Sequence, residues 1–245
     1  MLMNELFTHT LKALRQELGH NRPRDSRPLW QRRLSTASSF CQAVVGCGYL
    51  TSEQMQRAAV RYRLGISRDG GVIFWQIDEH GQLHDGKIMH YRPDCHRDHD
   101  RTPSWVSYEL RRHGQLPGDW KSEHCLFGLH LLADQSAGVT NRSVCVVESE
   151  KTAVIMSEVR PDCLWMATGG KTELSVARLK PLADRKVMLF PDTDEAGQTY
   201  RDWYEVAEMA GDVFGHPVTV SSFLERQATQ ALRAAKGDIV DQVFT

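Results

Sequence analysis

From residue 142 to residue 245, short apolar runs alternate with longer amphipathic stretches. Short runs rich in Val, Leu and Met are typical of buried strands, and the stretches between them have the period of a helix. The predicted strands are 144–147, 163–167, 187–190 and 217–221, and the predicted helices are 151–158, 173–182, 197–210 and 224–235. This alternation predicts an α/β fold with a mainly parallel sheet flanked by helices. Because such crossovers are right-handed, the carboxyl ends of the strands should meet at one edge.

Acidic residues follow two of the predicted strands at this edge. The strand at 187–190 is followed by Asp192 and Asp194, and the strand at 144–147 runs directly into Glu148. Carboxylates that lie close together repel one another, and a hard cation such as Mg²⁺ stabilises them. Each residue also has a structural alternative, because acidic side chains cap the starts of helices. Their recurrence at equivalent strand ends favours a shared metal site.

Two further segments should reach the same edge. The second predicted strand leads into Gly169, Gly170 and Lys171, a turn whose backbone N–H groups suit a phosphate, with the lysine as counter-charge. Near the end of the chain, Asp238 and Asp241 add two more carboxylates. The structural alternatives are an ordinary turn for the glycines and a helix N-cap for Asp238.

This pattern resembles the Toprim domain, a metal-binding α/β module of bacterial primases, topoisomerases and some nucleases. In that family a glutamate follows the first strand, as Glu148 does here. An Asp-x-Asp-x-x-Gly motif follows the third strand, as the segment from Asp192 to Gly197 does. The resemblance implies that Glu148, Asp192 and Asp194 are catalytic and that these three and Asp238 bind Mg²⁺ or Mn²⁺.

The region ahead of residue 142 resembles the small α+β subdomain that precedes the Toprim module in bacterial-type primases. Residues 71–81 are similar to a glycine- and aspartate-containing strand motif of that subdomain, and Leu-Phe-Gly-Leu at 126–129 is similar to the segment before the metal domain. The predicted elements here are strands at 72–77, 87–91 and 105–110 and a short helix at 125–132. Neither the zinc ribbon of primases nor a helicase Walker motif is visible.

The primase resemblance also implies a set of nucleotide- or DNA-binding residues. They are Lys87, Arg92, Lys151, Gly169, Gly170 and Lys171. For the lysines beside the acidic edge, the alternative is that they only neutralise surplus negative charge. One departure from the family pattern is Ser149, since a glycine commonly follows the glutamate there.

Residues 1–63 are predicted to be helical and basic, with a net charge of about +6 against about −7 for the remainder. Helices are predicted at 2–18, at 29–45 and from Thr51, with a linker at 21–28. A basic arm suits a partner made of phosphates, and it suits a solvated linker equally well. The expected organisation is a basic helical region (1–63), a primase-like α+β subdomain (64–141) and a Toprim domain (142–245).

Composition places the chain among ordinary globular proteins. No apolar stretch approaches the ~20 residues of a membrane span, and no signal peptide is visible, so a cytoplasmic protein without a membrane partner is expected. The six cysteines contain no Cys-x-x-Cys pair and are interpreted as reduced thiols. The loop with Cys95, His96 and His99 is too compressed for a structural zinc site.

Together with these patterns, the resemblance to primases implies Mg²⁺-dependent nucleotidyl transfer on single-stranded DNA, that is, primase-like synthesis of RNA primers. The expected partners are single-stranded DNA and nucleoside triphosphates, with a replicative helicase as a further candidate. The expected setting is a phage, plasmid or other mobile element. Two alternatives stay open: a metal-dependent nuclease with Glu150 or His216 as general base, and a non-catalytic DNA-binding accessory protein of replication.

Overall fold

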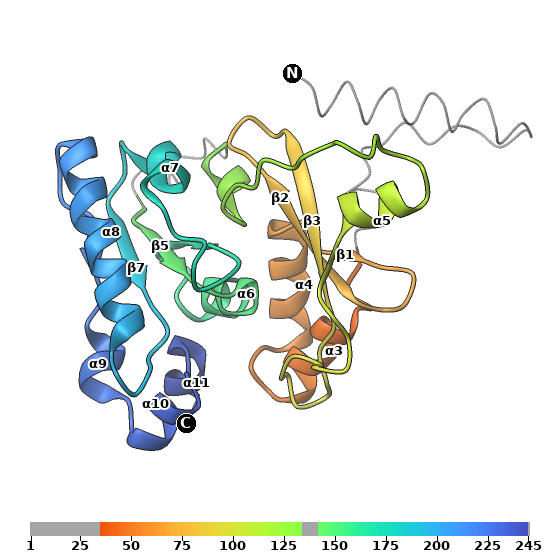
Figure 1. The fold of residues 1–245 in the computed structure, drawn as a ribbon. Coiled ribbons are helices and arrows are strands. Elements are labelled where there is room, and N and C mark those ends of the chain that lie inside the picture. The colour runs from red at the N-terminus through yellow and green to blue at the C-terminus, as the bar shows by residue number, and fades with distance from the viewer. Residues whose placement is uncertain (1–34, 134–141, 245) are drawn as a thin grey trace, which may run out of the picture.

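The computed structural model describes residues 35–133 and 142–244, and these residues form two lobes that lie side by side (Figure 1). One lobe is built on an antiparallel sheet in the order β1-β2-β3-β4, and the other on a parallel sheet in the order β6-β5-β7-β8. The predicted helix at 2–18 and the linker at 21–28 lie outside the described residues. Within the described part of the chain, no helix has the length and hydropathy needed to cross a membrane.

The parallel sheet confirms the α/β prediction. Its strands are β5 (Val144–Val147), β6 (Leu164–Ala167), β7 (Val187–Phe190) and β8 (Thr219–Val220). The intervening helical elements are α6 (Glu150–Val159), α7 (Val176–Leu179), η2 (Lys180–Leu182) and α8 (Gln198–Phe214). Three short helices follow, α9 (Phe223–Gln227), α10 (Gln230–Ala234) and α11 (Ile239–Val243).

Both faces of this sheet are covered over β5 and β6, which explains why these two strands are continuous buried apolar runs. One face, with Cys145 and Val147, shares a core with residues of α6 and with the antiparallel lobe. The other face, with Val144 and Val146, packs in a second core that includes Trp203 of α8. The carboxyl ends of β5, β6 and β7 therefore meet at one edge between layers of helices.

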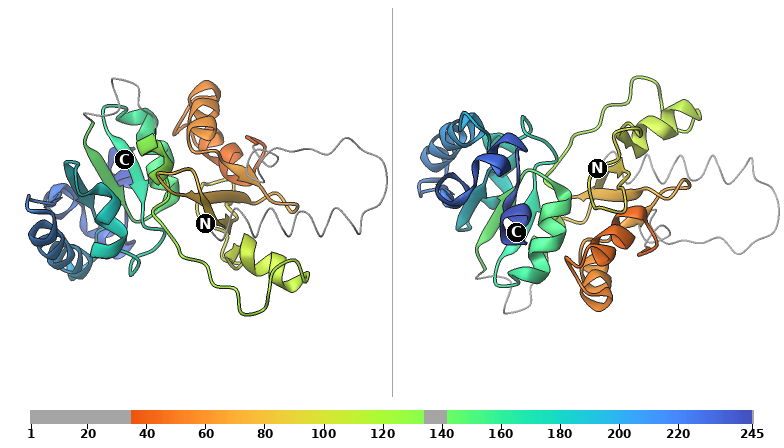
Figure 2. Two further views of the ribbon diagram at one scale, coloured as in Figure 1. Left: turned by 90° about the horizontal axis from the view of Figure 1, so that it is seen from above. Right: turned by 90° about the horizontal axis from the view of Figure 1, so that it is seen from below.

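In the described part of the chain, the antiparallel lobe comprises three α-helices, a 3₁₀ turn and a four-stranded sheet. Its elements are α3 (Ser39–Gly46), α4 (Ser52–Arg61), β1 (Gly65–Ile66), β2 (Val72–Ile77), β3 (Leu83–Met89), β4 (Ser104–Trp105), α5 (Val106–Arg112) and the 3₁₀ turn η1 (Leu129–Ala133). Alternate residues of β2 face different cores: Phe74 joins the core shared with the parallel sheet, whereas Trp75 joins a small core with Val106 of α5. Figure 2 shows α4, in orange, beside α6 at the junction of the lobes.

The sequence marks the start of α4 correctly. The backbone N–H of Gln54 donates to the Thr51 hydroxyl at 3.2 Å, and the Thr51 N–H donates to the Gln54 side chain at 2.9 Å. This reciprocal pair is a capping box, which satisfies two N–H groups that a helix start leaves without partners.

Several predicted elements differ from the structure, among them the helix at 29–45, which within the described residues begins only at Ser39. The predicted strand at 105–110 is wrong, because the buried Asp85 carboxylate accepts the Ser107 N–H at 3.0 Å and favours a helix start there. The predicted helix at 224–235 is two helices, separated at Ala228, whose backbone is extended. The predicted helix at 173–182 begins only at Val176, and its last turn is a 3₁₀ helix.

The Leu-Phe-Gly-Leu segment is mostly extended rather than helical, and it joins the edge of the parallel sheet. The Phe127 N–H donates to the Ala167 carbonyl at 2.9 Å, and the Ala167 N–H donates back at 3.0 Å. Gly128 has a positive φ of 87°. A Cβ there would lie 3.1 Å from the Trp165 carbonyl oxygen and 3.1 Å from the Tyr62 ring, so the position requires glycine.

Candidate active site

Glu148 and Asp192 lie at neighbouring strand ends. Strands β5 and β7 are paired in parallel with Val147 opposite Phe190, so the residues that follow them emerge side by side at the carboxyl edge. In open α/β sheets this edge is where ligands bind. Neither carboxylate has a hydrogen-bond or ion-pair partner among the residues that the structure describes.

Both carboxyl groups are disposed to hold a proton or a cation. Burial raises the pKa of Asp192 well above its usual range, and the nearby Glu148 and Asp238 raise it further. Burial also raises the pKa of Glu148, although Lys171 and Lys87 act in the opposite direction. Burial and mutual repulsion therefore disfavour the fully ionised pair, and a bound cation would stabilise it in that form.

Asp194 serves the start of α8. Its Oδ1 accepts the N–H groups of Ala196 and Gln198 at 3.0 and 2.9 Å. Its Oδ2 accepts the N–H and the hydroxyl of Thr199 at 2.7 and 2.6 Å. Burial alone would raise the pKa of Asp194, but these hydrogen bonds lower it far below its usual value. Asp194 thus fixes the loop that presents Asp192.

Asp238 is an N-cap, the structural alternative that the sequence left open. Its Oδ1 accepts the N–H groups of Val240 and Asp241 at 2.8 and 3.0 Å, and its Oδ2 accepts the Thr152 hydroxyl. Lys151 lies 3.7 Å from the same oxygen. Asp238 therefore joins α11 to the first turn of α6.

The C-terminal segment also holds the loop after β7. The Thr193 N–H donates to the Gly237 carbonyl at 3.0 Å. The Thr193 hydroxyl donates to Glu225 at 3.3 Å, and Arg233 binds the same carboxylate at 3.0 Å. The two contacts of Thr193 were not predicted from the sequence, because no local pattern pairs residues more than 30 positions apart.

Lys87 connects the two lobes at this edge. Its Nζ donates to the Gly169 carbonyl at 2.6 Å and lies 3.1 Å from the Glu150 carboxylate. The Glu150 side chain is buried, at 3% exposure, and the Lys87 side chain is partly buried, at 14%. The N–H of Gly169 in turn donates to the Glu148 carbonyl at 2.9 Å. Lys87 thus braces the glycine turn that lies against Glu148.

The other predicted binding residues differ in their exposure and in their ion-pair partners. Lys171 is 45% exposed and lies 3.9 Å from Asp194, so its ammonium is accessible at the edge. Gly169 has a φ of 87°, and Gly170 follows it in the same turn. Lys151 is largely buried between Asp238 and Asp241, where it neutralises charge. Arg92, in the antiparallel lobe, is 46% exposed and lies 3.7 Å from Asp98.

The carboxylates of Glu148 and Asp192 fit a divalent cation that has few protein ligands. Mg²⁺ usually keeps several waters and binds one or two carboxylates together with substrate phosphates, which matches the two unpartnered carboxylates of Glu148 and Asp192. Within residues 35–133 and 142–244, no three His, Cys, Asp or Glu side chains converge as a preformed metal cluster, and this holds for the loop around Cys95 as well.

Neither residue named as a nuclease base is available beside Glu148 and Asp192. Glu150 is buried in its ion pair with Lys87. His216 lies 2.5 Å from the Ala183 carbonyl, which precedes β7, whereas Asp192 follows β7. His216 is therefore at the opposite edge of the sheet.

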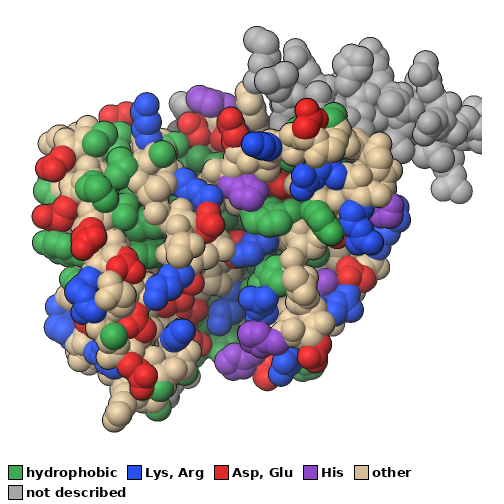
Figure 3. Space-filling view, in the orientation of Figure 1, with side chains coloured by type: hydrophobic (Ala, Val, Ile, Leu, Met, Phe, Trp, Pro, Cys, Tyr) green, Lys and Arg blue, Asp and Glu red, His purple; other side chains and the backbone are tan. Residues whose placement is uncertain are grey.

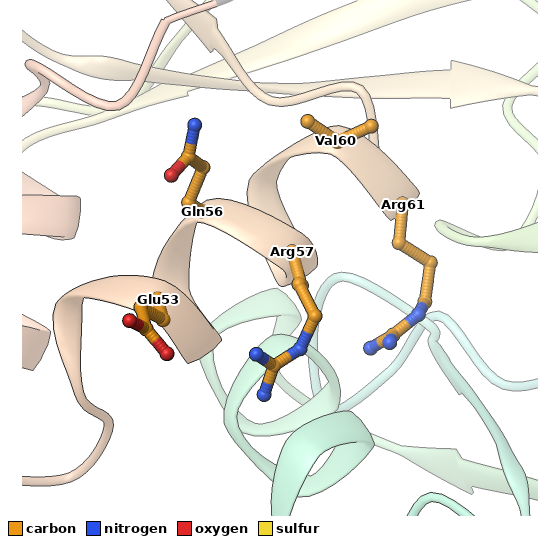
Figure 4. Close-up of a pocket in the computed structure, with 5 residues that line it drawn as sticks. All are labelled: Glu53, Gln56, Arg57, Val60 and Arg61. Atoms are coloured by element: carbon orange, nitrogen blue, oxygen red, sulfur yellow. The ribbon is translucent and has the colours of Figure 1, made fainter.

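The surface is hollowed between the lobes (Figure 3). Acidic and basic side chains occur on both lobes in this view, and both kinds border the hollow. A separate shallow depression on the surface of α4 is lined by Glu53, Gln56, Arg57, Val60 and Arg61 (Figure 4). Arg57 and Arg61 pair there with Glu158, at the far end of α6 from the candidate site.

Residues 38–193 match a family described as a domain of unknown function, DUF6371. The chain belongs to this family. The matched residues contain Glu148, Asp192, Lys87 and the glycine turn, and they end before Asp194 and the C-terminal helices. No curated protein matches the chain.

Three solved structures are similar to this DUF6371 chain. The primase fragment of the bacteriophage T7 primase-helicase protein is 19% identical, with 82% of this chain and 73% of that chain covered and a TM-score of 0.44. The second structure contains the primase domains of gp4 in a complex with the T7 lagging-strand DNA polymerase, an RNA/DNA hybrid and dTTP. It is 19% identical, with 78% of this chain and 86% of that chain covered and a TM-score of 0.41. The third structure is the Aquifex aeolicus primase, comprising its zinc-binding and RNA polymerase domains. It is 13% identical, with 93% of this chain and 65% of that chain covered and a TM-score of 0.44. All three TM-scores are below 0.5, so the fold of this chain is defined by its own strand orders, β1-β2-β3-β4 and β6-β5-β7-β8.

Proposed function

We propose that this chain is a Toprim-type, primase-like enzyme that carries out Mg²⁺- or Mn²⁺-dependent nucleotidyl transfer on single-stranded DNA. The observation that supports this most is the pair of unpartnered carboxylates, Glu148 and Asp192, at the ends of adjoining parallel strands. In the Toprim pattern these are the positions after the first and third strands, and β5 and β7 are neighbours in the sheet here.

In this proposal, Glu148 and Asp192 hold the cation. Asp194 and Asp238 support these two residues indirectly, because their carboxylates fix the starts of α8 and α11. Lys171, which is accessible, binds a phosphate of the incoming nucleotide. The N–H groups of Gly169 and Gly170 take no part, because they donate to the Glu148 carbonyl and the Thr168 hydroxyl. Lys87 and Lys151 neutralise Glu150 and Asp238, so the excess negative charge is concentrated on the two free carboxylates.

The bound cation would supply charge neutralisation and alignment for in-line attack of a 3′-hydroxyl on a nucleoside triphosphate. The substrates are nucleoside triphosphates and a single-stranded DNA template, and a replicative helicase is the proposed protein partner. That the protein acts in the replication of a phage, plasmid or other mobile element stays a prediction from the sequence.

Synthesis is favoured over cleavage by the surroundings of the two carboxylates. A nuclease needs a general base to activate water. Glu150 is engaged by Lys87, and His216 lies at the other edge of the sheet.

The test is an assay with labelled ribonucleotides, unlabelled single-stranded DNA and Mg²⁺ or Mn²⁺, with cleavage of a labelled strand scored in parallel. We expect metal-dependent RNA products, and a loss of about 100-fold or more in E148Q and D192N. The matched control is D212N, because Asp212 is an exposed carboxylate at the far end of α8.

Two results would overturn the proposal in favour of its rivals. Metal-dependent cleavage without synthesis, lost in both variants, would indicate a nuclease. DNA binding that needs no metal, with neither product and no effect of E148Q or D192N, would indicate an accessory protein.

A further inference from the structure

A stacked aromatic pair lies on the face of the antiparallel sheet that carries Lys87. In the β2–β3 register Phe74 is opposite Lys87, and in the β3–β4 register Lys87 is opposite Trp105. Residues opposite each other on antiparallel strands share a face, so these three side chains form a row. Lys87 reaches Gly169 across the junction of the lobes, so this face is turned toward the carboxyl edge of the parallel sheet.

The rings of Trp105 and His124 form a parallel stack. Their centroids are 4.0 Å apart, and their planes differ by 21°. His124 Nε2 lies 3.6 Å from the carboxylate of Asp85. That carboxylate is buried, and it accepts the Ser107 hydroxyl at 2.5 Å and the Ser107 N–H at 3.0 Å. The start of α5 thus fixes Asp85, and Asp85 fixes the edge of the imidazole.

The Trp105–His124 pair is held in position and is partly exposed to solvent. Trp105 is partly exposed, and the His124 side chain is 25% exposed. By contrast, Phe74 and Trp75 in the same sheet are fully buried and belong to the cores. Two flat rings that are held in position and partly exposed to solvent resemble the platforms on which proteins stack nucleobases, because every base has a π-face.

We propose that the Trp105–His124 pair is a nucleobase platform of the candidate site. A base of a nucleotide or of single-stranded DNA stacks on the open face of the pair, while the phosphates of the same ligand lie toward Lys171 and the acidic edge. This inference rests on the proposed function in that the ligand is a nucleotide or a nucleic acid. Since stacking tolerates any base, the platform contributes affinity with little sequence preference.

The experiment measures binding of a fluorescein-labelled single-stranded oligonucleotide to the full chain by anisotropy, with Mg²⁺ present. We expect W105A to weaken binding about 10-fold, H124A to weaken it less, and W105F to restore most of the affinity. The matched control is Y108A, because Tyr108 is an exposed aromatic residue of the same lobe outside the pair. A second oligonucleotide of abasic residues keeps the phosphates and removes the bases, so W105A and the wild type should bind it equally.

A parallel titration with ATP identifies the source of the base. Weakening of ATP binding by W105A assigns the platform to the incoming nucleotide, and weakening of oligonucleotide binding alone assigns it to the DNA strand. Equal binding by W105A and the wild type in both titrations overturns the inference, and so does an equal loss on abasic and ordinary strands. Neither result bears on metal-dependent synthesis by the wild type, so the inference can fail while the proposed function stands. Thermal unfolding of W105A shows whether the fold is intact, and W105F covers the case in which it is not.

Discussion

Asp192 and Asp194 are two positions apart, yet their carboxylates have opposite surroundings. Asp194 accepts four hydrogen bonds from the start of α8, whereas Asp192 accepts none from the described residues. Hydrogen bonds to the charged form lower a carboxyl pKa, and burial beside other carboxylates raises it. One residue of the motif therefore stabilises the fold, and the other strains it electrostatically.

Neutralising Glu148 or Asp192 should stabilise the metal-free protein at neutral pH. A carboxyl whose pKa is raised by folding favours the folded state most below its unfolded pKa of about 4, and this stability is lost as pH rises through the folded pKa. Each unit of upward shift corresponds to about 1.4 kcal/mol. We expect a higher urea midpoint at pH 7 for E148Q and D192N, and stabilisation by Mg²⁺ in the wild type that both variants lose. An unchanged midpoint in both variants, or equal stabilisation by Mg²⁺, would contradict this account.

Asp194 should show the opposite pH dependence. Its pKa is lowered by folding, so it contributes stability above the unfolded pKa of about 3.9, and that contribution is lost as pH falls through the folded value. We expect D194A to lower the free energy of unfolding at pH 7 by about 1–2 kcal/mol, in the range of lost helix caps. The difference from the wild type should shrink in urea titrations at progressively lower pH. D212A is the control, and a constant difference at all pH values would argue against the capping role.

At the scale of elements, the ion pair between β3 and α6 is a connection between two sheets. Glu150 is buried and Lys87 is partly buried, and Lys87 also binds the turn after β6. Removing one member of a buried pair leaves the other charge without compensation, which typically costs 3–5 kcal/mol. The lysine matters here as a structural link as well as a charge.

A double-mutant cycle tests this link. We expect K87M to destabilise the protein by about 3 kcal/mol or more, and K87M with E150Q to be clearly more stable than K87M alone. The free energies come from urea unfolding. The exposed pair of Arg160 and Asp162 provides the control, because R160M should have a small effect. Additive effects of K87M and E150Q would show that the two residues do not act together.

At the scale of the molecule, one apolar core crosses every predicted region boundary. It contains Phe40 and Met55 from residues 1–63, Phe74 from 64–141, and Val147 and Val154 from 142–245. The three-region organisation stays a prediction. A shared core of this kind ties the stability of each part to the others, because separating them exposes the apolar faces that they bury together.

We therefore expect the two lobes to unfold together. Far-UV circular dichroism and tryptophan fluorescence should give coincident urea transitions, since both sheets carry buried tryptophans, Trp75 and Trp165. Residues 142–245 expressed alone should lack a cooperative transition, because the face with Cys145 and Trp165 would be exposed. Two separate transitions, or a cooperative fragment, would show that the lobes are independent.

Much of this molecule could be predicted from the sequence because it depends on local patterns. Strand and helix alternation fixed the α/β class, and the capping box at Thr51 marked the start of α4. The same reasoning was weaker for short helices, where a hydrogen bond from a distant residue decides the conformation, as Asp85 does for α5.

The sequence by itself determined that acidic residues follow two strands and that a parallel sheet brings such residues to one edge. Only the tertiary structure decided which carboxylates are free. Asp194 and Asp238 are engaged by helix starts, Lys87 and Lys151 are engaged by buried acids, and Glu148 and Asp192 are left without partners. The physical reason is twofold. An ion pair between distant residues, such as Lys87 and Glu150 at 63 positions apart, leaves no local signal in the sequence, although it decides the charge that a site presents to a ligand. At Asp194 the bonds are local, but the same Asp-x-Asp spacing fits a helix start and a metal ligand equally well.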